Sequence, residues 1–131
     1  MNTKIDKILA EVSAGELIDK ITILEIKKVK ITNKDKLIEI DKEFNSLNST
    51  LQSSIPDISK ISNFKDQLKN INLKLWEIED EKRNAEKRKN FDKKFISLAR
   101  NVYKFNDERA KIKLAINEAL GSNIKEVKSH F

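Results

Sequence analysis

The fold is decided by residues 58–120, which read ISKISNFKDQLKNINLKLWEIEDEKRNAEKRKNFDKKFISLARNVYKFNDERAKIKLAINEAL. Mostly apolar side chains recur there at alternating spacings of three and four residues, the pattern of one buried helix face. The first stripe contains Ile61, Phe64, Leu68, Ile71, Leu75, Ile78, Lys82 and Ala85. The second contains Phe91, Phe95, Leu98, Val102, Phe105, Arg109, Ile112, Ile116 and Ala119. Because the phase changes in the polar stretch between them, we expect two helices, at 58–89 and 91–120, folded into a long antiparallel, coiled-coil-like hairpin.

The ends of the second helix carry start and stop signals. Asn90 is a favourable N-cap, with Asp92 in the first turn, where the helix dipole favours an anion. Gly121 follows the apolar stripe, and glycine is the usual residue where a helix ends in the left-handed conformation. Residues 122–131 form a short tail whose order the sequence leaves open.

A further helix is expected over residues 13–31. Ser13-Ala14-Gly15-Glu16 has the form of a capping box, in which the Ser13 hydroxyl accepts from the Glu16 amide and the Glu16 side chain returns to the Ser13 amide. The apolar residues that follow cover more than half of the helix circumference. We therefore expect this helix to be buried on several sides.

The helix over 13–31 is joined to a helix over 34–54 by a turn at 32–35, so these two helices make a second, shorter hairpin. Pro56 follows the second of them, because proline cannot continue a helix. Residues 5–12 fit either a short helical turn or an extended arm, and the sequence does not decide between the two.

The composition fits one small helical domain spanning residues 1–131. The chain has 27 Lys and Arg against 21 Asp and Glu, a formal net charge of +6, with two Gly, one Pro and no Cys. Because sandwiches and barrels need many turns, the expected fold class is all-α, a bundle of the two hairpins. No apolar run approaches the roughly 20 residues of a membrane-spanning helix. The first residues lack an apolar secretory signal, so we expect a cytoplasmic protein.

The residue inventory argues against familiar catalytic sites. Two glycines cannot build a phosphate loop, and the lack of Cys removes thiol chemistry and thiolate-ligated metals. The single histidine, His130, lies in the tail, and no histidine accompanies the carboxylate cluster at 77–81 as di-iron bundles require. We therefore expect no catalytic residue, no metal and no cofactor. One enzymatic alternative is a chorismate-mutase-like helical enzyme, which works with Arg, Lys and Glu and without His; the matching side chains are Lys20, Glu25, Arg83, Arg100 and Arg109.

In a hairpin that turns at Asn90, residues whose numbers sum to about 180 lie at equal height. Asp80 then lies near Arg100, and Glu77 lies near Tyr103. The expected polar network contains Glu77, Asp80, Arg83, Arg100 and Tyr103. The simpler interpretation is a set of solvated pairs between helices, each worth about 0–1 kcal/mol.

Arg109 occupies a position in an otherwise apolar stripe. A buried guanidinium needs an anionic partner, and the neighbouring positions of its own helix offer none. Asp19 and Glu25 on the helix over 13–31 are the candidate partners. The alternative is that Arg109 reaches past the edge of the stripe to solvent.

Two binding hypotheses follow from the charged residues. The first is a small-anion or sugar-phosphate site formed by Arg83, Arg100, Tyr103, Asn106 and Arg109. The second is non-specific nucleic-acid binding by residues 82–94, which we call the basic tip. The tip has Lys82, Arg83, Lys87, Arg88, Lys89, Lys93 and Lys94 against Glu86 and Asp92, a local charge of +5. A solvated, lysine-rich turn is the simpler interpretation, and we do not favour nucleic-acid binding.

Three segments are distinctive: EVSAGELIDKITILEIK at 11–27, LWEIED at 75–80 and FISLARNVYKFNDERA at 95–110. Together they resemble a family of small bacterial all-helical proteins that carries only a domain-of-unknown-function label. The resemblance implies no established activity. It implies an association with glycosyltransferases of cell-surface polysaccharide synthesis, near which members of the family occur.

The favoured function is a non-catalytic helical interaction or adaptor module. The helix over 13–31 is apolar on too many sides for one hairpin, so we expect spare apolar surface on it and on the helix over 58–89. This surface would bind a protein partner or a second copy of the chain. The anion site, the helical enzyme and the nucleic-acid-binding tip are the alternatives.

Overall fold

The computed structural model describes residues 4–130, and the described chain is almost entirely helical. Its elements are α1 (Ala14–Lys30), α2 (Lys34–Ser54), a short 3-10 helix η1 (Ile58–Ile61), α3 (Ser62–Lys87) and α4 (Lys93–Leu120). No strand occurs between residues 4 and 130, so the predicted all-α class is confirmed. Residues 1–3 and 131, which belong to the predicted domain and tail, lie outside the described part.

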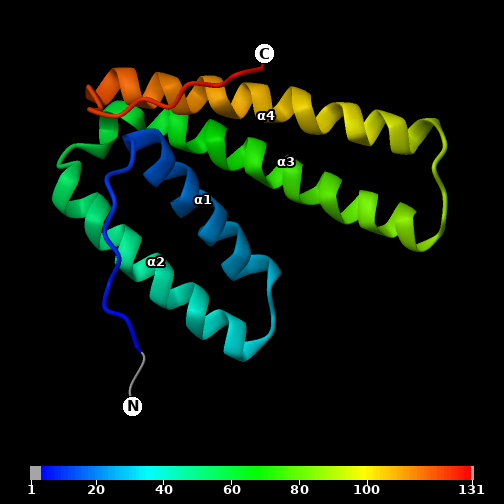
Figure 1. The fold of residues 1–131 in the computed structure, drawn as a ribbon, viewed down its shortest axis with the longest axis horizontal. Coiled ribbons are helices and arrows are strands. Elements are labelled where there is room, and N and C mark those ends of the chain that lie inside the picture. Colours follow the sequence, from blue (N-terminus) through cyan, green and yellow to red (C-terminus); the bar gives the residue numbers. More distant parts are fainter. Residues whose placement is uncertain (1–3, 131) are drawn as a thin grey trace.

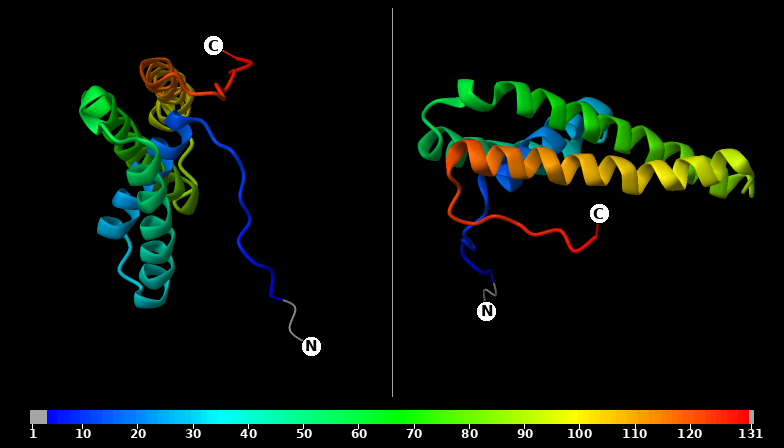
Figure 2. Two further views of the ribbon diagram at one scale, coloured as in Figure 1. Left: turned by 90° about the vertical axis from the view of Figure 1, so that its left-hand side faces the viewer. Right: turned by 90° about the horizontal axis from the view of Figure 1, so that it is seen from above.

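The helices form two pairs that meet at α1. α3 and α4 lie side by side and run in opposite directions, and α1 and α2 form the second pair (Figure 1). α1 contacts α2, α3 and α4, whereas α2 contacts no other described helix than α1. The half of the α3–α4 hairpin next to its turn projects beyond the α1–α2 pair (Figures 1 and 2). No helix within residues 4–130 is long and apolar enough to cross a membrane.

The hydrophobic core gathers around α1. Its fully and nearly fully buried members are Leu17, Ile18, Ile21, Leu51, Ile61, Leu68 and Ile116. These residues come from all four α-helices and η1, so the burial of α1 on several sides agrees with its broad apolar circumference. Ile18, Ile61, Leu68 and Ile116 are 0% exposed, which places the centre of the core at the end of the hairpin remote from its turn.

The predicted capping box at the start of α1 forms only in part. The Ser13 hydroxyl accepts from the Glu16 amide at 3.1 Å, as expected. The Glu16 carboxylate does not return to the Ser13 amide; it receives the Lys113 ammonium at 2.6 Å. A cation on α4 thus takes the acceptor that a local cap would have used.

The α3–α4 turn differs from the prediction by two residues. Asp92, not Asn90, is the N-cap of α4, and its carboxylate accepts the amides of Lys94 and Phe95 at 3.0 and 3.3 Å. Asn90 lies in the turn after α3, and its amide donates back to the Ala85 carbonyl of that helix at 2.9 Å. The two predicted helices, 58–89 and 91–120, are therefore each shorter at the turn.

The predicted helix at 58–89 begins with a separate 3-10 turn. Asp57 caps η1 by accepting the Ser59 amide at 3.0 Å. Ile61 then leaves helical geometry, with φ −124° and ψ 8°, before α3 starts, and its side chain is completely buried. Upstream of α1, residues 4–12 have no regular structure, and Ile8 and Leu9 are 80% and 88% exposed. The extended arm is therefore the alternative that the structure shows.

Gly15 sits where α1 and α4 approach most closely. Its amide donates to the Asn117 side-chain oxygen at 2.6 Å. A Cβ at this position would overlap the backbone carbonyl oxygen of Lys113. Only glycine therefore permits this approach of the two helices.

We expect Gly15→Ala to lower the free energy of unfolding by about 1–3 kcal/mol, the usual cost of overpacking. In an unconstrained helix position alanine is instead favoured over glycine by up to about 1 kcal/mol. A loss of stability in Gly15→Ala would therefore indicate the close approach of the two helices. The measurement is urea unfolding followed by circular dichroism.

The matched control is Gly121→Ala. Gly121 has a left-handed φ of 63° and no atom within 4 Å of an added Cβ. Its substitution should cost about 1 kcal/mol through backbone strain alone. A more stable Gly15→Ala protein would contradict the close approach.

Candidate functional site

A buried polar cluster fixes α1 across the α3–α4 hairpin. Asp19 on α1 is 1% exposed and forms an ion pair with Arg109 of α4. Its other contact is the side-chain amide of Asn72 on α3, which donates to Oδ1 at 2.8 Å and to the Thr22 hydroxyl at 2.9 Å. Thr22 in turn donates to the Asp19 backbone carbonyl at 2.8 Å. Both carboxylate oxygens of Asp19 and the buried amide nitrogen of Asn72 are thus hydrogen-bonded, as buried polar groups require.

Arg109 binds Asp19 through two nitrogens. Nε donates to Oδ1 at 3.0 Å, and Nη2 donates to Oδ2. A third contact joins Nη1 to the Asn106 side-chain oxygen at 3.4 Å. The hydrogen bond to Asp19 raises the pKa of Arg109 above its ordinary value, although burial alone would lower it. Of the two candidate partners from the sequence, the structure places Asp19 against Arg109.

Glu25, the other candidate, links α1 to α3 instead. Its Oε1 lies 3.9 Å from Lys65 Nζ and 3.8 Å from Lys69 Nζ. These distances are those of ion pairs rather than of hydrogen bonds. Glu25 therefore supports the crossing of α1 over α3 one turn beyond the Asp19 cluster.

The C-terminal tail, residues 122–130, turns back at the end of α4 and runs alongside that helix (Figure 2). Its attachments reach the first turn of α1. The Ser122 hydroxyl accepts the Ala14 amide at 3.1 Å, and Glu126 accepts the Ser13 hydroxyl at 3.0 Å. Glu126 also binds Lys113 at 3.3 Å. The sequence did not predict whether this tail is ordered. In the structure it is held in place by its contacts with the N-terminus of α1.

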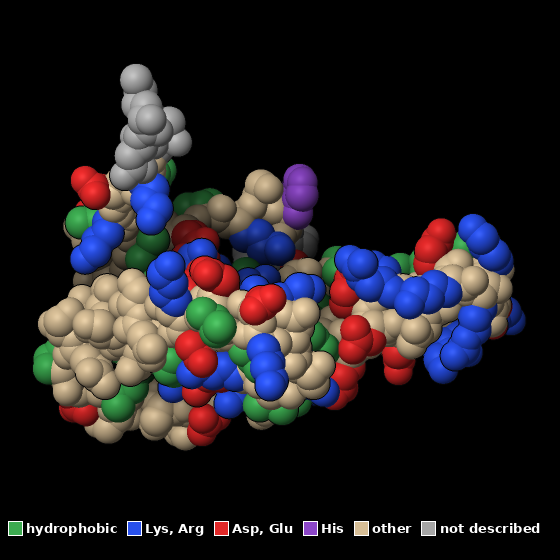
Figure 3. All heavy atoms as spheres, turned by 90° about the horizontal axis from the view of Figure 1, so that it is seen from below, with side chains coloured by type: hydrophobic (Ala, Val, Ile, Leu, Met, Phe, Trp, Pro, Cys, Tyr) green, Lys and Arg blue, Asp and Glu red, His purple; other side chains and the backbone are tan. Residues whose placement is uncertain are grey.

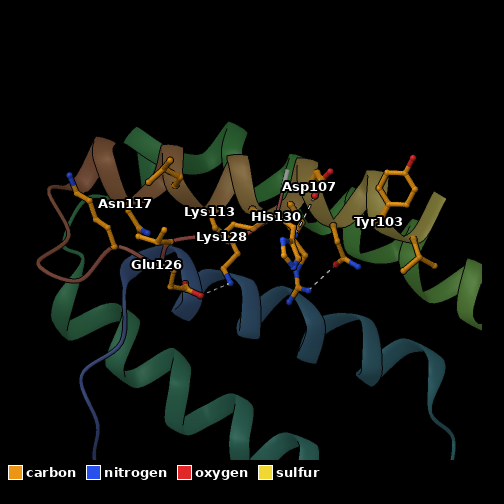
Figure 4. Close-up of a pocket in the computed structure, with 14 residues that line it drawn as sticks. Tyr103, Asp107, Lys113, Asn117, Glu126, Lys128 and His130 are labelled. Carbon is orange, nitrogen blue, oxygen red and sulfur yellow. Dashed lines mark hydrogen bonds and ion pairs between the residues drawn. The ribbon is translucent and has the colours of Figure 1, made fainter. Parts of the chain in front are cut away.

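Between this tail and α4 lies a groove of about 1050 Å³ (Figure 4). Its apolar lining consists of Val102, Ala110, Leu114 and Val127, and its polar lining includes Tyr103, Asn106, Asp107, Arg109, Lys113, Asn117, Lys125, Glu126, Lys128 and His130. Lys113 and Lys128 point toward Glu126 and Asp107, their carboxylate partners.

Most of the cations in this groove are already neutralised. Arg109 is paired with Asp19, Lys113 with Glu16 and Glu126, and Lys128 with Asp107 at 3.3 Å. Burial lowers the pKa of Lys113, but its hydrogen bond with Glu16 and the other nearby carboxylates outweigh burial, so that pKa lies above its ordinary value. An incoming anion would have to compete with these internal carboxylates.

The five side chains of the predicted anion site do not converge. Tyr103, Asn106 and Arg109 line the groove. Arg83 instead pairs with Glu79 on its own helix at 2.9 Å. Arg100 is exposed and lines none of the described pockets. The structure therefore brings together only the part of the set that lies on one face of α4.

The predicted interhelix network is likewise not assembled. Glu77, Asp80, Arg100 and Tyr103 are all on the exposed surface, and Tyr103 is 57% exposed. Within residues 4–130, no ion pair joins Glu77 or Asp80 to Arg100. The polar network that α1, α3 and α4 do share lies one or two turns further from the hairpin turn, around Asp19.

The basic tip lies at the free end of the hairpin. Lys82 and Arg83 are paired with Glu79 there, at 4.0 and 2.9 Å. Phe91 and Phe95 form an edge-to-face pair with ring centroids 5.2 Å apart, and Phe91 is 50% exposed. Phe95 is partly buried, so one ring of the pair packs inward while the other stays at the surface.

Sequence reasoning did not place seven polar residues in the site. They are Glu16, Thr22, Asn72, Lys113, Asn117, Ser122 and Glu126. Thr22 and Asn72 did leave a signal, because each lies four residues after a core residue, Ile18 and Leu68, on an otherwise apolar face. The tail residues left none. Within residues 4–130, no three carboxylate or imidazole side chains are grouped as metal ligands are.

The fold and this cluster are those of a small helical protein whose helices are tied together by buried polar contacts. The chain belongs to the family of unknown function DUF6165, which it matches over residues 8–130. No curated protein and no solved structure matches it. The matched range includes α1 through α4 and the tail that lines the groove.

We expect Arg109→Leu to lower the free energy of unfolding by about 3 kcal/mol, because it leaves the buried Asp19 carboxylate without its cation. The matched control is Arg83→Leu. That change breaks an exposed pair with Glu79 and should alter stability by no more than about 0.5 kcal/mol. Thermal and urea unfolding measure both, and a higher melting temperature for Arg109→Leu would refute the proposed role of the pair.

We expect the stabilising contribution of Lys113 to disappear in alkali. Because its pKa is higher in the folded chain than the ordinary value of 10.5, the stabilisation is fully present below that value and is lost as the pH rises through the folded pKa. Lys113→Met should therefore be less stable than the wild type by about 1–2 kcal/mol near neutrality. Urea unfolding of both proteins, repeated at increasing pH, should show the difference narrowing above pH 10.5; a difference that widens would contradict the assignment.

Proposed function

We propose that this protein is a non-catalytic helical interaction module that self-associates along the outward face of α4. One observation carries the proposal: an apolar stripe on the side of α4 that faces away from the core, where Tyr103, Ala110 and Leu114 also form part of the wall of the groove beside the tail. Ile96, Tyr103 and Leu114 are 52%, 57% and 39% exposed. We call the set Ile96, Tyr103, Ala110 and Leu114 the outward stripe.

The spacing of the outward stripe supports a helix-binding face. Its members follow one another at seven, seven and four residues. At 3.6 residues per turn these positions share one face of α4, roughly opposite the buried Leu98 and Ile116. A row of exposed large hydrophobic residues on a monomer marks an interaction surface more often than a solvated one.

The outward stripe also suits a second copy of itself. In an antiparallel pair of α4 helices related by a two-fold axis at residue 105, Ile96 faces Leu114 of the second copy, since both numbers sum to 210. Tyr103 then faces Asp107 of the second copy, whose carboxylate, already paired with Lys128, can accept a further hydrogen bond from the tyrosine hydroxyl. A two-fold interface needs such self-complementarity.

This surface differs from the spare surface expected on the first and third helices. α2, α3 and α4 cover the apolar sides of α1 within the chain, except at Val29 near its end, which is 81% exposed. Most of the excess apolar residues of α1 are thus accounted for without a partner. The self-association that we propose therefore uses α4.

The small-anion site finds less support, because the groove cations have internal carboxylate partners. The same pairing supports a non-catalytic role over a chorismate-mutase-like one. We further propose that the module acts in the bacterial cytoplasm as an adaptor in cell-surface polysaccharide synthesis. This last part is supported by the resemblance of its three distinctive segments alone.

Light scattering across a range of micromolar concentrations tests the self-association. We expect a dimer for the wild type and a monomer for the double variant Ile96→Lys and Tyr103→Lys, whose dimer dissociation constant should rise on the order of 100-fold. The matched control is Ile38→Lys, which places the same charge at a 64% exposed isoleucine of α2. It should remain dimeric.

Two outcomes would overturn this proposal. One is a wild-type protein that stays monomeric up to the millimolar range. The other is a dimer that survives the double variant, because the interface would then lie elsewhere. Circular dichroism serves to check that each variant keeps its helices.

A further inference from the structure

The basic tip carries positive charge that nothing in the described chain balances. Among residues 4–130, five of its cations have no carboxylate partner: Lys87, Arg88, Lys89, Lys93 and Lys94. The carboxylate of Asp92 is engaged with the backbone amides of Lys94 and Phe95. Figure 3 shows Lys and Arg side chains gathered at the end of the molecule formed by the α3–α4 turn.

One of these cations occupies a position that local geometry would give to glycine. Lys89 has a φ of 57°, in the left-handed region, and it is the only non-glycine residue with positive φ between residues 4 and 130. This backbone conformation is strained for any residue with a Cβ. The chain thus keeps a lysine at the apex despite the strain.

An aromatic ring stands among the cations. Phe91 is 50% exposed, although it lies in the turn between α3 and α4 and makes an edge-to-face contact with Phe95. Apolar side chains at a turn usually fold back onto the hairpin. Here half of the ring stays in solvent, with Lys89 and Lys93 two residues away on either side.

The tip also projects beyond α1 and α2 (Figure 1). Every hydrogen bond and ion pair that joins α1 to the hairpin involves residues 65–72 of α3 or 109–117 of α4. The hairpin continues well past them to the turn (Figure 1). A flat surface can therefore meet the tip without touching α1 or α2.

We propose that the basic tip docks onto an anionic lipid bilayer. Its lysines lie against the phosphate and carboxylate headgroups, and Phe91 enters the interfacial layer between headgroups and acyl chains. Clustered Lys and Arg near an anionic leaflet are attracted to it in proportion to their number, and an apolar side chain beside them adds burial in the interface.

The observations favour a bilayer over a nucleic acid. Cations that track a nucleic-acid backbone line a groove or a helix face, with aromatic rings as flat stacking platforms. Here the cations gather at the projecting end of the hairpin, and the ring of Phe91 is already engaged in an edge-to-face contact with Phe95. Four of the five unpaired cations are lysines, which act as point charges rather than as bidentate readers of phosphate.

Sedimentation with lipid vesicles tests this docking on the full chain. We expect binding to phosphatidylcholine vesicles that contain about one third phosphatidylserine, no binding to pure phosphatidylcholine, and weaker binding as salt shortens the electrostatic range. The triple variant Lys87→Glu, Lys89→Glu and Lys93→Glu should bind on the order of 100-fold more weakly.

The matched control reverses the charge of three exposed lysines of α2: Lys34→Glu, Lys36→Glu and Lys42→Glu. It has the same net charge as the tip variant and should bind as the wild type does. Phe91→Ser should weaken binding on the order of tenfold, whereas Ile38→Ser, at a 64% exposed residue of α2, should not.

The docking is refuted if the wild type does not bind anionic vesicles. It is also refuted if both triple variants lose binding equally, since the net charge of the chain would then explain the binding. Binding of the tip to an oligonucleotide without binding to vesicles would also refute it. A second measurement does not depend on the charge variants. A tryptophan placed by Phe91→Trp in a Trp76→Phe background should shift its emission to the blue on anionic vesicles, and an unchanged spectrum would contradict insertion.

Discussion

The arrangement of these helices depends on one buried carboxylate. Asp19 is 1% exposed at the point where α1 crosses α3 and α4, and a charge buried that far must be compensated by partners of the right geometry. Arg109 and Asn72 supply them from two different helices. Because both partners reach Asp19 from fixed positions, the rotation of α1 about its axis and its height along the hairpin are set together.

The same crossing shapes the groove. Arg109 and Lys113 are drawn toward Asp19 and Glu16 on α1, and Gly15 lets the backbones of α1 and α4 come close enough for these contacts. Nearer the hairpin turn, Ile96 and Tyr103 of α4 face solvent. A single helix therefore carries a polar face toward α1, an apolar face toward α3 and a second apolar face toward the outside.

Much of this fold could be predicted from the sequence, because its signals are local. Helix periodicity identified the four helices. Ser13 caps the start of α1 and Gly121 caps the end of α4, as the sequence predicts. The unsatisfied charge of Arg109 in an apolar stripe indicated a partner on the first helix, since burial of a lone guanidinium is too costly. The cap at Asp92 was missed because Asn90 and Asp92 are both good caps, and only the backbone contact of Asn90 with Ala85 distinguishes them.

The rest of the site had no periodic or local signal. The tail is held by single side-chain contacts to residues more than a hundred positions earlier, such as Glu126 to Ser13 and Ser122 to Ala14. The expected pairs of Glu77 and Asp80 with helix α4 failed for a different reason. Equal height in a hairpin does not make two side chains face each other. On this exposed surface, hydration of the charged groups is about as favourable as an ion pair between them.

The attachment of the tail to the start of α1 has a consequence for the synthesis of the chain. Ser13 and Glu126 are separated by 113 positions, so α1 cannot complete its own N-terminal contacts until residue 126 has been made. Contacts between such distant residues slow folding. During translation the apolar sides of α1 are covered as α2, α3 and α4 follow, and the polar contacts at its N-terminus are completed last.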